Sequence, residues 1–455
     1  MSLGPPEKLQ KLRAALHAKA KASPKQRFHA LYDKVYRSDV LAHAYVCCKA
    51  NGGAAGVDDQ TFADIETYGR DRWLGELAEA LRVKTYRPDP VRRVWIPKPD
   101  GKQRPLGIPT IRDRVVQTAA MVVIEPAMLV IEPIFEADLQ PEQYAYRQNR
   151  SALHAVNHVR NLLNSGHTQV VDADLSGYFD RVPHAELMQC LARRIVDGAM
   201  LHLLKMWLEA PVEEIDERGN RQRTTRNKDE GRGTPQGAPI SPLLSNLYMR
   251  RFVLGWKTLG HEARLHARIV NYADDFVICC RGTADQAMTV MRDMMGALKL
   301  TVNETKTQVR QVPAETFDFL GYTFGLHWTH RTKRMLLCGA PSKKRVARVC
   351  QKISAITDRK RCCLAPDEVV GELNRVLHGW ANYFCLGPVS DTYRAINAHA
   401  RYRFRKWWGA KHKNARFGPC WYWSPWLERT FGLLQLRWDP ARLRAVPSRL
   451  PHANA

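Results

Sequence analysis

The sequence predicts an α+β fold in which short apolar strands alternate with longer amphipathic helices. Residues 271–280, NYADDFVICC, have aromatic and branched residues on both sides of an Asp pair, as expected for two strands joined by a turn. Residues 168–184 begin with an apolar run that ends in acidic residues, and residues 317–324 form another short apolar run. Residues 185–209 instead repeat their apolar positions at helical spacing, which predicts an amphipathic helix.

The N-terminal part of the chain is predicted to be mainly helical. Residues 1–50 are basic and carry apolar residues at helical spacing, and the glycines of 51–59 interrupt the pattern. Further helices are expected around residues 61–82. Residues 91–109, VRRVWIPKPDGKQRPLGIP, predict two strands joined by a turn at Pro99-Asp100-Gly101.

The middle of the chain adds further helices and one hairpin. A buried helix is expected at residues 111–135. Residues 211–233 are polar with mixed charges, which is typical of a hairpin that projects into solvent. Residues 234–256 predict a proline-broken loop that leads into a long helix, and residues 284–300 predict a helix with a run of methionines.

Length and charge narrow the classes of function. The chain has 455 residues, which suggests about three domains. Its formal charge of +25 favours a polyanionic partner, with nucleic acid first and an anionic membrane surface second. No apolar run approaches the ~18–20 residues that a membrane span needs. The N-terminal segment lacks the apolar core of a signal peptide, so no membrane partner is expected.

The cysteines do not indicate a metal site. There are 11 of them, an odd number, and no C-x-x-C spacing of the kind that holds zinc. Adjacent pairs occur at Cys47-Cys48, Cys279-Cys280 and Cys362-Cys363. Reduced thiols of a cytoplasmic protein are therefore expected.

The composition changes past about residue 337. Residues 342–361 contain eight Lys or Arg and one Asp, and residues 400–416 contain seven Lys or Arg with no acid. Aromatic residues are interleaved there and in CWYWSPW at 420–426. Such stretches are usually a solvated face, but the scarcity of acids and the aromatic residues favour contact with nucleic acid.

Acidic residues follow two separate apolar strands. Asp172 and Asp174 end the first strand, about a hundred residues before Asp274. If these strand ends meet at one edge of a sheet, their like charges require divalent cations. Two Mg²⁺ ions about 3.5–4 Å apart can activate an attacking hydroxyl and stabilise a leaving phosphate oxygen. In a basic protein, such a site predicts a polymerase or a nuclease.

A series of motifs resembles those of reverse transcriptases, in particular of group II intron type. YADD (272–275) is similar to the family signature, and DLSGYFD (174–180) is similar to its first catalytic strand. IPKPDGKQRPLGIP (96–109) resembles the fingers hairpin, and GTPQGAPISPLLSNLY (233–248) resembles the loop and helix that contact template and nucleotide. Five further segments resemble two later motifs, the N-terminal motif, the thumb and the basic DNA-binding region: LTVNETKT (300–307), FLGYTF (319–324), NGGAAGVD (51–58), LNRVLHGWANYF (373–384) and RKWWGAKHK (405–413).

The resemblance implies a right-hand polymerase whose fingers and palm contain an antiparallel sheet. The N-terminal extension and early fingers would occupy 1–90, and the fingers and palm 91–335. A helical thumb, or maturase region, would occupy 336–398, and a small basic DNA-binding-like region 399–455. A bacterial, cytoplasmic ribonucleoprotein is the implied setting.

The resemblance also assigns the metal site. Asp174, Asp274 and Asp275 would be the catalytic residues. Together with the backbone carbonyl of Leu175 they would hold two Mg²⁺ ions, for which Mn²⁺ can substitute. Asp172 lies on the same strand face as Asp174 but is expected to form a structural salt bridge.

Other positions would bind the incoming nucleotide or the nucleic acid. Lys98 and Arg104 would neutralise the triphosphate, unless they belong to an ordinary solvated hairpin. Phe179 would exclude a 2′-hydroxyl, with a core aromatic as the alternative, and Lys306 would donate a proton or contact phosphate, or else face solvent. The remaining assignments are Gln236 and Gly237 for the nucleotide, and Arg401, Arg403, Arg405, Lys406, Lys411 and Lys413 for nucleic acid.

The sequence departs from the family pattern in three places. Ala238 stands where the family loop has a second glycine. The F-R-P-G-R-S stretch of the family is YRQNRS (146–151) here, which keeps Arg147, Arg150 and Ser151. No paired-Cys and His constellation follows residue 420, so a C-terminal nuclease module is not expected.

The function implied by the resemblance is RNA-directed DNA synthesis, combined with binding of intron RNA to assist splicing and mobility. The implied partners are structured RNA, an RNA template, a DNA primer or target, and deoxynucleoside triphosphates. A free-standing, domesticated relative in defence or DNA repair is one alternative. An RNA-binding maturase with an unused polymerase is another, which the intact Asp174, Asp274 and Asp275 argue against. Template, primer source, splicing role and oligomeric state stay open.

Overall fold

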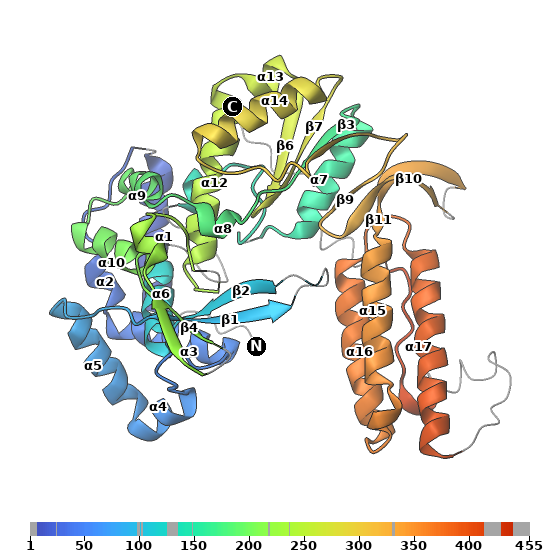
Figure 1. Ribbon diagram of the computed structural model, residues 1–455, viewed down its shortest axis with the longest axis horizontal. Coiled ribbons are helices and arrows are strands. Elements are labelled where there is room, and N and C mark those ends of the chain that lie inside the picture. Colours follow the sequence, from blue (N-terminus) through green and yellow to red (C-terminus); the bar gives the residue numbers. More distant parts are fainter. Residues whose placement is uncertain are drawn as a thin grey trace.

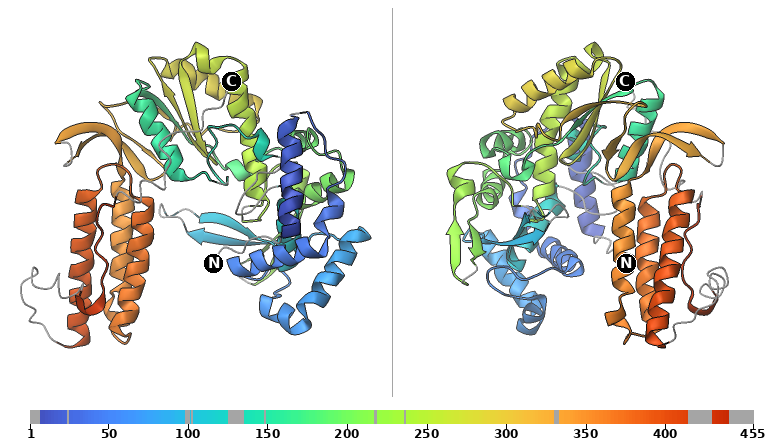
Figure 2. Two further views of the ribbon diagram at one scale, coloured as in Figure 1. Left: turned by 180° about the vertical axis from the view of Figure 1, so that it is seen from behind. Right: turned by 45° about the vertical axis from the view of Figure 1, so that its right-hand side comes forward.

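The computed structural model describes residues 7–23, 25–97, 101, 103–124, 135–147, 149–216, 219–235, 237–329, 333–413 and 429–439. Lys98 and Gln236, two predicted nucleotide-binding residues, lie outside these ranges. Figure 1 shows three parts: fingers in blue, cyan and light green, a palm that runs from green to yellow, and an orange to red thumb. Both views of Figure 2 agree that the thumb stands apart from the fingers and that the palm joins them.

Helices form the base of the fingers. The N-terminal helices are α1 (Glu7–Ala22), α2 (Tyr32–Val35), α3 (Ser38–Asn51), α4 (Phe62–Tyr68), α5 (Arg70–Arg82) and α6 (Ile111–Ile124). Helix α6 is buried along almost its whole length, as the apolar sequence predicted. It packs closely against α3, so this helical unit anchors the strands that follow it.

The fingers sheet has the strand order β2-β1-β4-β5. The predicted hairpin is formed by β1 (Val91–Pro97) and β2 (Gln103–Ile108), which pair antiparallel. The second hairpin, β4 (Val212–Ile215) and β5 (Arg221–Thr224), does not project freely, because β4 pairs in parallel with β1. Its Glu213 side chain is 3% exposed and accepts ion pairs from two arginines on β5, which explains the mixed charges of this segment.

The predicted helix at 185–209 is two helices, α9 (His184–Ala192) and α10 (Gly198–Leu208). Asp197 separates them by capping α10, since its carboxylate accepts hydrogen bonds from the amides of Ala199 and Met200. The same carboxylate accepts the amides of Leu31 and Tyr32, which ties this junction to the N-terminal helices.

The palm sheet is antiparallel, with the order β6-β7-β3-β8. Its strands are β3 (Gln169–Ala173), β6 (Ala267–Tyr272), β7 (Asp275–Cys280) and β8 (Gln308–Gln311). Side chains alternate between two cores: Val171 and Ile278 join the large core that contains residues of α12 (Ser241–Thr258) and α14 (Ala284–Ala297), whereas Val170 and Val277 face α7 (Ala152–Asn164). Burial on both faces explains the continuous apolar runs.

A three-stranded sheet, β11-β10-β9, links palm and thumb. The short strand predicted at 317–324 is two strands, β9 (Phe317–Phe319) and β10 (Tyr322–Thr329). The chain reverses at Leu320 and Gly321, which both have positive φ. Strand β11 (Arg334–Pro341) then pairs with the full length of β10.

The thumb is a bundle of α15 (Lys343–Ile356), α16 (Pro366–Tyr383) and α17 (Ser390–Lys411), as Figure 1 shows. The boundary expected at 398/399 falls inside α17 and does not separate two units there. The helix buries Tyr393 and Ile396 before that point and Phe404 and Trp407 after it, all in one core. The boundary expected at 335/336 likewise falls inside β11.

Short elements complete the described chain: η1 (Glu136–Asp138), α8 (Tyr178–Arg181), α11 (Arg226–Asp229), α13 (His261–Arg264) and η2 (Arg359–Arg361). In the ranges that the structure describes, every helix is too short or too polar to cross a membrane.

Candidate active site

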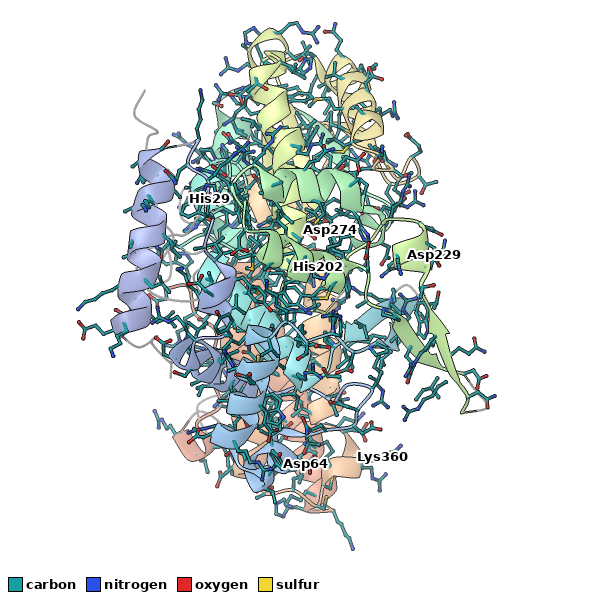
Figure 3. All side chains as sticks on the ribbon, turned by 90° about the vertical axis from the view of Figure 1, so that its left-hand side faces the viewer. His29, Asp64, His202, Asp229, Asp274 and Lys360 are labelled. Carbon is teal, nitrogen blue, oxygen red and sulfur yellow. The ribbon has the colours of Figure 1, made fainter. Side chains whose placement is uncertain are left out.

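The Asp pair lies at the turn between β6 and β7. Tyr272 pairs with Asp275, so Ala273 and Asp274 form the turn itself, and Ala273 adopts a positive φ of 58°. The fully buried Asn271 fixes the turn from beneath, because its side-chain amide donates to the Ala273 carbonyl at 2.8 Å. Asp274 and Asp275 are both exposed residues, although the carboxyl of Asp275 loses part of its surrounding water, and Figure 3 labels Asp274 near the centre of the molecule.

Asp174 reaches the same edge from the neighbouring strand. Ala173 is paired with Phe276 across β3 and β7, so the next residues outward, Asp174 and Asp275, end adjacent strands side by side. The sequence predicted this convergence, and the strand register provides it. Leu175 continues along the edge, where it bridges Val302 with its side chain 6% exposed.

A turn after α14 holds Asp174 in place. The side-chain amide of Asn303 donates to Asp174 Oδ2 at 2.9 Å, and the Asn303 backbone N–H donates to the Asp174 carbonyl at 2.8 Å. Lys306, from the same turn, places its ammonium 3.1 Å from Asp174 Oδ2. Asn303 lies within the segment that resembled a family motif, but no feature of the sequence distinguished it as an Asp174 partner.

Negative charge accumulates at this edge. Loss of water around the Asp275 carboxyl, followed by the charges of Asp274 and Asp174, raises its pKa to about 7. Burial also raises the pKa of Asp172 to about 6, against the opposing charge of Arg310. A carboxylate cluster with too little positive charge around it suits a divalent cation.

The carboxylates are not preset for a metal ion. Within the described residues, no three His, Cys, Asp or Glu side chains are already grouped as a metal site. The Lys306 ammonium neutralises part of the charge of Asp174 instead. Asp174 is half-buried, whereas Asp274 and Asp275 are exposed, and the three end adjacent strands.

The fingers hairpin packs onto the loop before α12. Gly237 has a φ of 106°, and a Cβ there would lie 2.5 Å from the Gly107 carbonyl oxygen and 2.8 Å from a methyl of Leu106. Glycine is therefore required for the fit of this loop against β2. The adjacent Ala238 is 2% exposed. Arg104 is exposed on the same hairpin.

Phe179, expected beside the nucleotide sugar, is 7% exposed and belongs to the main core. Its backbone carbonyl accepts the Thr234 N–H at 2.7 Å, which ties α8 to the loop that carries Gly237. Its backbone therefore lies next to the predicted nucleotide site, while its ring is largely covered.

Tyr146 is an aromatic residue at the site that sequence reasoning missed. Its ring is 49% exposed and its φ is 54°. Its pKa is raised, first by partial burial and then by the charge of Asp274, while Arg104 lowers it. The phenol therefore lies between the palm carboxylates and the fingers.

Three anchors hold the loop that carries Tyr146. The Arg147 guanidinium donates to the Gln140 and Gln143 carbonyls at 2.6 and 2.8 Å and pairs with Glu136. Arg150 donates to the Pro141 carbonyl at 2.6 Å. The Tyr144 N–H donates to the Asn271 carbonyl, which fixes the loop to β6. The arginines that YRQNRS keeps from the family pattern were the feature of the sequence that could have drawn attention to this loop.

The basic residues of α17, together with Lys413 just after the helix, divide into two groups. Arg403 donates to the Ser354 carbonyl at 2.9 Å, and Lys411 donates to the Cys362 and Leu364 carbonyls at 2.9 and 2.8 Å. Arg401 bonds Gln435 at 2.9 Å. These three brace the bundle. Lys406 and Lys413 are exposed, and Arg405 is half-buried.

The two tryptophans of α17 belong to the bundle rather than to an open surface. Trp407 is 1% exposed. Trp408 is half-buried and packs against Phe431, with ring centroids 5.0 Å apart. Packing thus explains these two aromatics without base stacking.

The chain matches two family models. "Reverse transcriptase (RNA-dependent DNA polymerase)" covers residues 96–324, and "Group II intron, maturase-specific domain" covers residues 346–425. The first match spans the fingers hairpin, the three carboxylates and the start of β10. The second spans most of the thumb and continues across the division expected at 398/399.

Two curated proteins are similar in sequence. Protein YkfC of Escherichia coli (strain K12) is 35% identical over 281 residues, 54% of this chain and 69% of that protein. Group II intron-encoded protein LtrA of Lactococcus lactis subsp. cremoris is 26% identical over 371 residues, 68% of this chain and 58% of LtrA. The chain thus spans little more than half of the LtrA length.

Solved structures with reverse transcriptase parts are more distant. A partial Cas6-RT-Cas1–Cas2 complex is 19% identical, with a TM-score of 0.35 over 60% of this chain and 44% of its own. Telomerase from Candida albicans is 12% identical, with a TM-score of 0.39 over 75% of this chain and 63% of its own.

Proposed function

The chain belongs to the reverse transcriptase family of RNA-dependent DNA polymerases and carries a group II intron maturase-specific domain, and on this premise we propose that it copies RNA into DNA at the edge formed by Asp174, Asp274 and Asp275. The observation that carries the proposal is the convergence of these carboxylates at the ends of β3 and β7. The mutual repulsion of these three acids opposes folding, which favours a role in chemistry over a role in stability.

In the proposed reaction, the primer 3′-hydroxyl attacks the α-phosphate of a deoxynucleoside triphosphate. A new O–P bond forms, the bond to the β-phosphate breaks, and the hydroxyl proton and pyrophosphate leave. Asp174, Asp274, Asp275 and the Leu175 carbonyl would hold two Mg²⁺ ions, whose charge stabilises the attacking and leaving oxygens. The raised pKa of Asp275 supports this fit, since it arises from burial first and then from the negative charges of Asp274 and Asp174.

Side chains around the carboxylates would bind the triphosphate. Arg104 and Lys98 would neutralise the phosphates from the fingers hairpin. Gly237 would keep the loop with Gln236 close to the nucleotide, and its tight packing on β2 supports that placement. Lys306 would leave Asp174 when cations enter, and would then donate a proton to pyrophosphate.

Phe179 and Tyr146 would share the sugar side of the site. Phe179 would exclude a 2′-hydroxyl from the nucleotide sugar. Its ring is largely covered, so only the exposed edge of the ring would contact the sugar. Tyr146 is the more accessible ring of the two, at 49% against 7% exposed.

The maturase-specific domain supports a second role, in which the thumb binds structured intron RNA while the RNA performs the splicing chemistry. The formal charge of +25 suits such a ribonucleoprotein, which we place in a bacterial cytoplasm. A domesticated relative that works without an intron would share every feature of the polymerase site. The DNA that flanks the gene distinguishes the two, because an intron-borne copy lies within intron RNA domains.

Primer extension tests the proposed reaction. Purified chain should extend a DNA primer annealed to an RNA template when deoxynucleotides and Mg²⁺ are present, and chelation of Mg²⁺ should abolish the product. Ribonucleotides should be poor substrates. Binding of the primer–template without any extension would instead support a pure RNA-binding role.

A further inference from the structure

A cavity of about 610 Å³ lies on the side of the palm sheet covered by α7, apart from the carboxylates. Its walls come from the C-terminal turns of α7, the β10–β11 hairpin, the loop and first residues that begin α17, and Trp438. Figure 1 shows α7, β11 and α17 meeting where palm and thumb join. Among the residues that the structure describes, none of those proposed for catalysis or nucleotide binding lines this cavity.

One wall is a rigidly mounted aromatic ring. Trp438 lines the cavity and is 40% exposed. Two asparagines clamp the segment that leads to it. Asn374 bonds the Gly432 carbonyl and the Leu434 N–H at 2.8 and 2.7 Å, and Asn397 bonds the carbonyl and N–H of Leu436, both at 2.9 Å.

The facing wall is polar and basic. It carries Arg160, Asn161 and Asn164, which lie within about one turn of α7. The Asn164 amide donates to the Leu337 carbonyl at 3.0 Å, which fixes the helix to β11. Across the ranges that the structure describes, Arg160 forms no ion pair with a carboxylate. Asp391, the acid of the cavity wall, is paired with Arg394 at 3.2 Å.

An exposed apolar strip leads out of the cavity along the β10–β11 hairpin. Leu337, at the cavity, pairs across the hairpin with Leu326, and the next pair on this face is Trp328 with Met335. The last three are 44%, 49% and 50% exposed. Lys333 and Arg334 follow at the end of the hairpin, both exposed. Cations beside open aromatic and apolar side chains are typical of surfaces that bind unpaired nucleic acid.

We propose that this cavity binds an unpaired nucleotide of the RNA that the thumb holds, with the base against Trp438 and the 3′ or 5′ phosphate at Arg160. The inference rests on the proposed function, since it names how the maturase-specific domain would hold its RNA. The volume suits a ligand of nucleotide size. Asn161 offers an amide donor and acceptor for a base edge, and Asn164, whose N–H groups bond the Arg160 and Leu337 carbonyls, offers its amide oxygen as an acceptor. The flanking strand would follow the strip to Trp328.

A polypeptide is the other occupant that an apolar cavity admits. The charges favour RNA, because Arg160 forms no ion pair within the described residues and the hairpin end adds Lys333 and Arg334, while Asp391 in the wall is paired with Arg394. Arg binds phosphate through a planar fork, which a neutral peptide cannot use.

Photocrosslinking tests the proposal directly. The full chain is mixed with an unpaired RNA of about 10–12 nucleotides that carries 5-iodouridine, and the crosslinked peptide is identified by mass spectrometry. We expect a crosslink at Trp438. Asn161→Ala and Trp438→Ala should each weaken binding of this RNA by about fivefold or more. Tyr402→Ala, which removes an exposed aromatic of α17 outside the cavity, is the matched control and should not.

Asn161→Ala keeps the test valid even if Trp438→Ala unfolds, because Asn161 is an exposed helix residue. Extension of a short primer should be unchanged in both variants. Failure of the unmodified chain to extend a primer would contradict the proposed polymerase. Intact extension, together with no crosslink at Trp438 and no change of RNA affinity in the two variants, would overturn this inference alone. Equal crosslinking to DNA of the same sequence would overturn the assignment to RNA.

Discussion

The ammonium of Lys306 lies 3.1 Å from Oδ2 of Asp174, so a side chain of the protein occupies the place where a metal ion would bind the first carboxylate. Both partners are substantially exposed, at 61% and 34% of their side-chain surfaces. An exposed pair of this kind contributes only about 0–1 kcal/mol to folding. The ion pair between Lys306 and Asp174 therefore matters less for stability than for how readily the Lys306 ammonium leaves the Asp174 carboxylate.

Replacing the Lys306 ammonium by a neutral side chain should strengthen Mg²⁺ binding at the carboxylates. In Lys306→Gln, Mg²⁺ no longer competes with an ammonium, so we expect the Mg²⁺ concentration for half-maximal extension to fall by roughly two- to threefold. The melting temperature should hardly change. Lys299→Gln, which removes an ion pair with Glu186, is the control. An increased Mg²⁺ requirement for Lys306→Gln would show that Lys306 organises the site instead.

The ionised carboxylate of Asp275 should lower the stability of the metal-free protein at alkaline pH. Its pKa of about 7 exceeds the usual value of about 3.9, so the folded state binds this proton more tightly. The stability from this group is complete below about pH 4 and is lost as the pH rises through about 7. Asp275→Asn avoids the loss, and we expect it to raise the free energy of unfolding by roughly 1 kcal/mol at about pH 8 in chelator, after screening by solvent.

The check is thermal unfolding at two pH values. The advantage of Asp275→Asn over the unmodified chain should narrow at about pH 5.5, where the folded carboxyl is protonated. Asp293→Asn, on an exposed position of α14, should show no such narrowing. A variant that melts at a lower temperature than the unmodified chain at both pH values would refute the assignment of uncompensated charge.

The hairpins and carboxylate strands could be predicted from sequence because their signals are local. Turn residues between apolar runs mark the β6–β7 and β1–β2 hairpins, and β3 ends in acids. Other features depend on distant partners. Asp197 divides α9 from α10 by bonding amides of both α10 and the N-terminal helices, and the pairing of β4 with β1 joins segments over a hundred residues apart.

The same limit applied to the site. Composition suggested that all basic residues of α17 face a partner, yet Arg403 and Lys411 satisfy backbone carbonyls of the bundle. Helical periodicity alone does not show that a Lys or Arg side chain donates hydrogen bonds to backbone carbonyls near the end of another helix. Tyr146 was not predicted because its placement depends on hydrogen bonds from Arg147 and Arg150 to backbone carbonyls. Every residue has a backbone carbonyl, so the sequence does not mark these acceptors.

Tyr146 should contribute to nucleotide binding. Tyr146→Ala removes an exposed ring near Asp274, and we expect the KM for deoxynucleotides to rise by about tenfold. The melting temperature should stay nearly constant because the ring is half exposed. Tyr146→Phe keeps the ring and should retain most activity. Steady-state extension with limiting nucleotide measures this, and an unchanged KM for Tyr146→Ala would remove the residue from the site.

The basic residues of α17 and the adjacent Lys413 should fall into two groups with different phenotypes. Lys406→Gln with Lys413→Gln should weaken RNA binding and reduce the slope of log affinity against log salt by roughly 0.7–0.9 for each lost phosphate contact, at constant melting temperature. Arg403→Gln with Lys411→Gln should lower the melting temperature first, since buried carbonyls lose their donors. The opposite assignment of the two phenotypes would mean that the bundle rearranges on binding RNA.

The central claim, that Asp174, Asp274 and Asp275 perform the chemistry and do not hold the RNA, is tested most directly by Asp274→Asn combined with Asp275→Asn. This variant keeps the shape of the turn and removes its charge. Primer extension on an RNA template and equilibrium binding of the same primer–template are measured on one preparation. We predict that extension is lost while affinity for the primer–template changes no more than a few-fold. Extension at the rate of the unmodified chain would contradict the account.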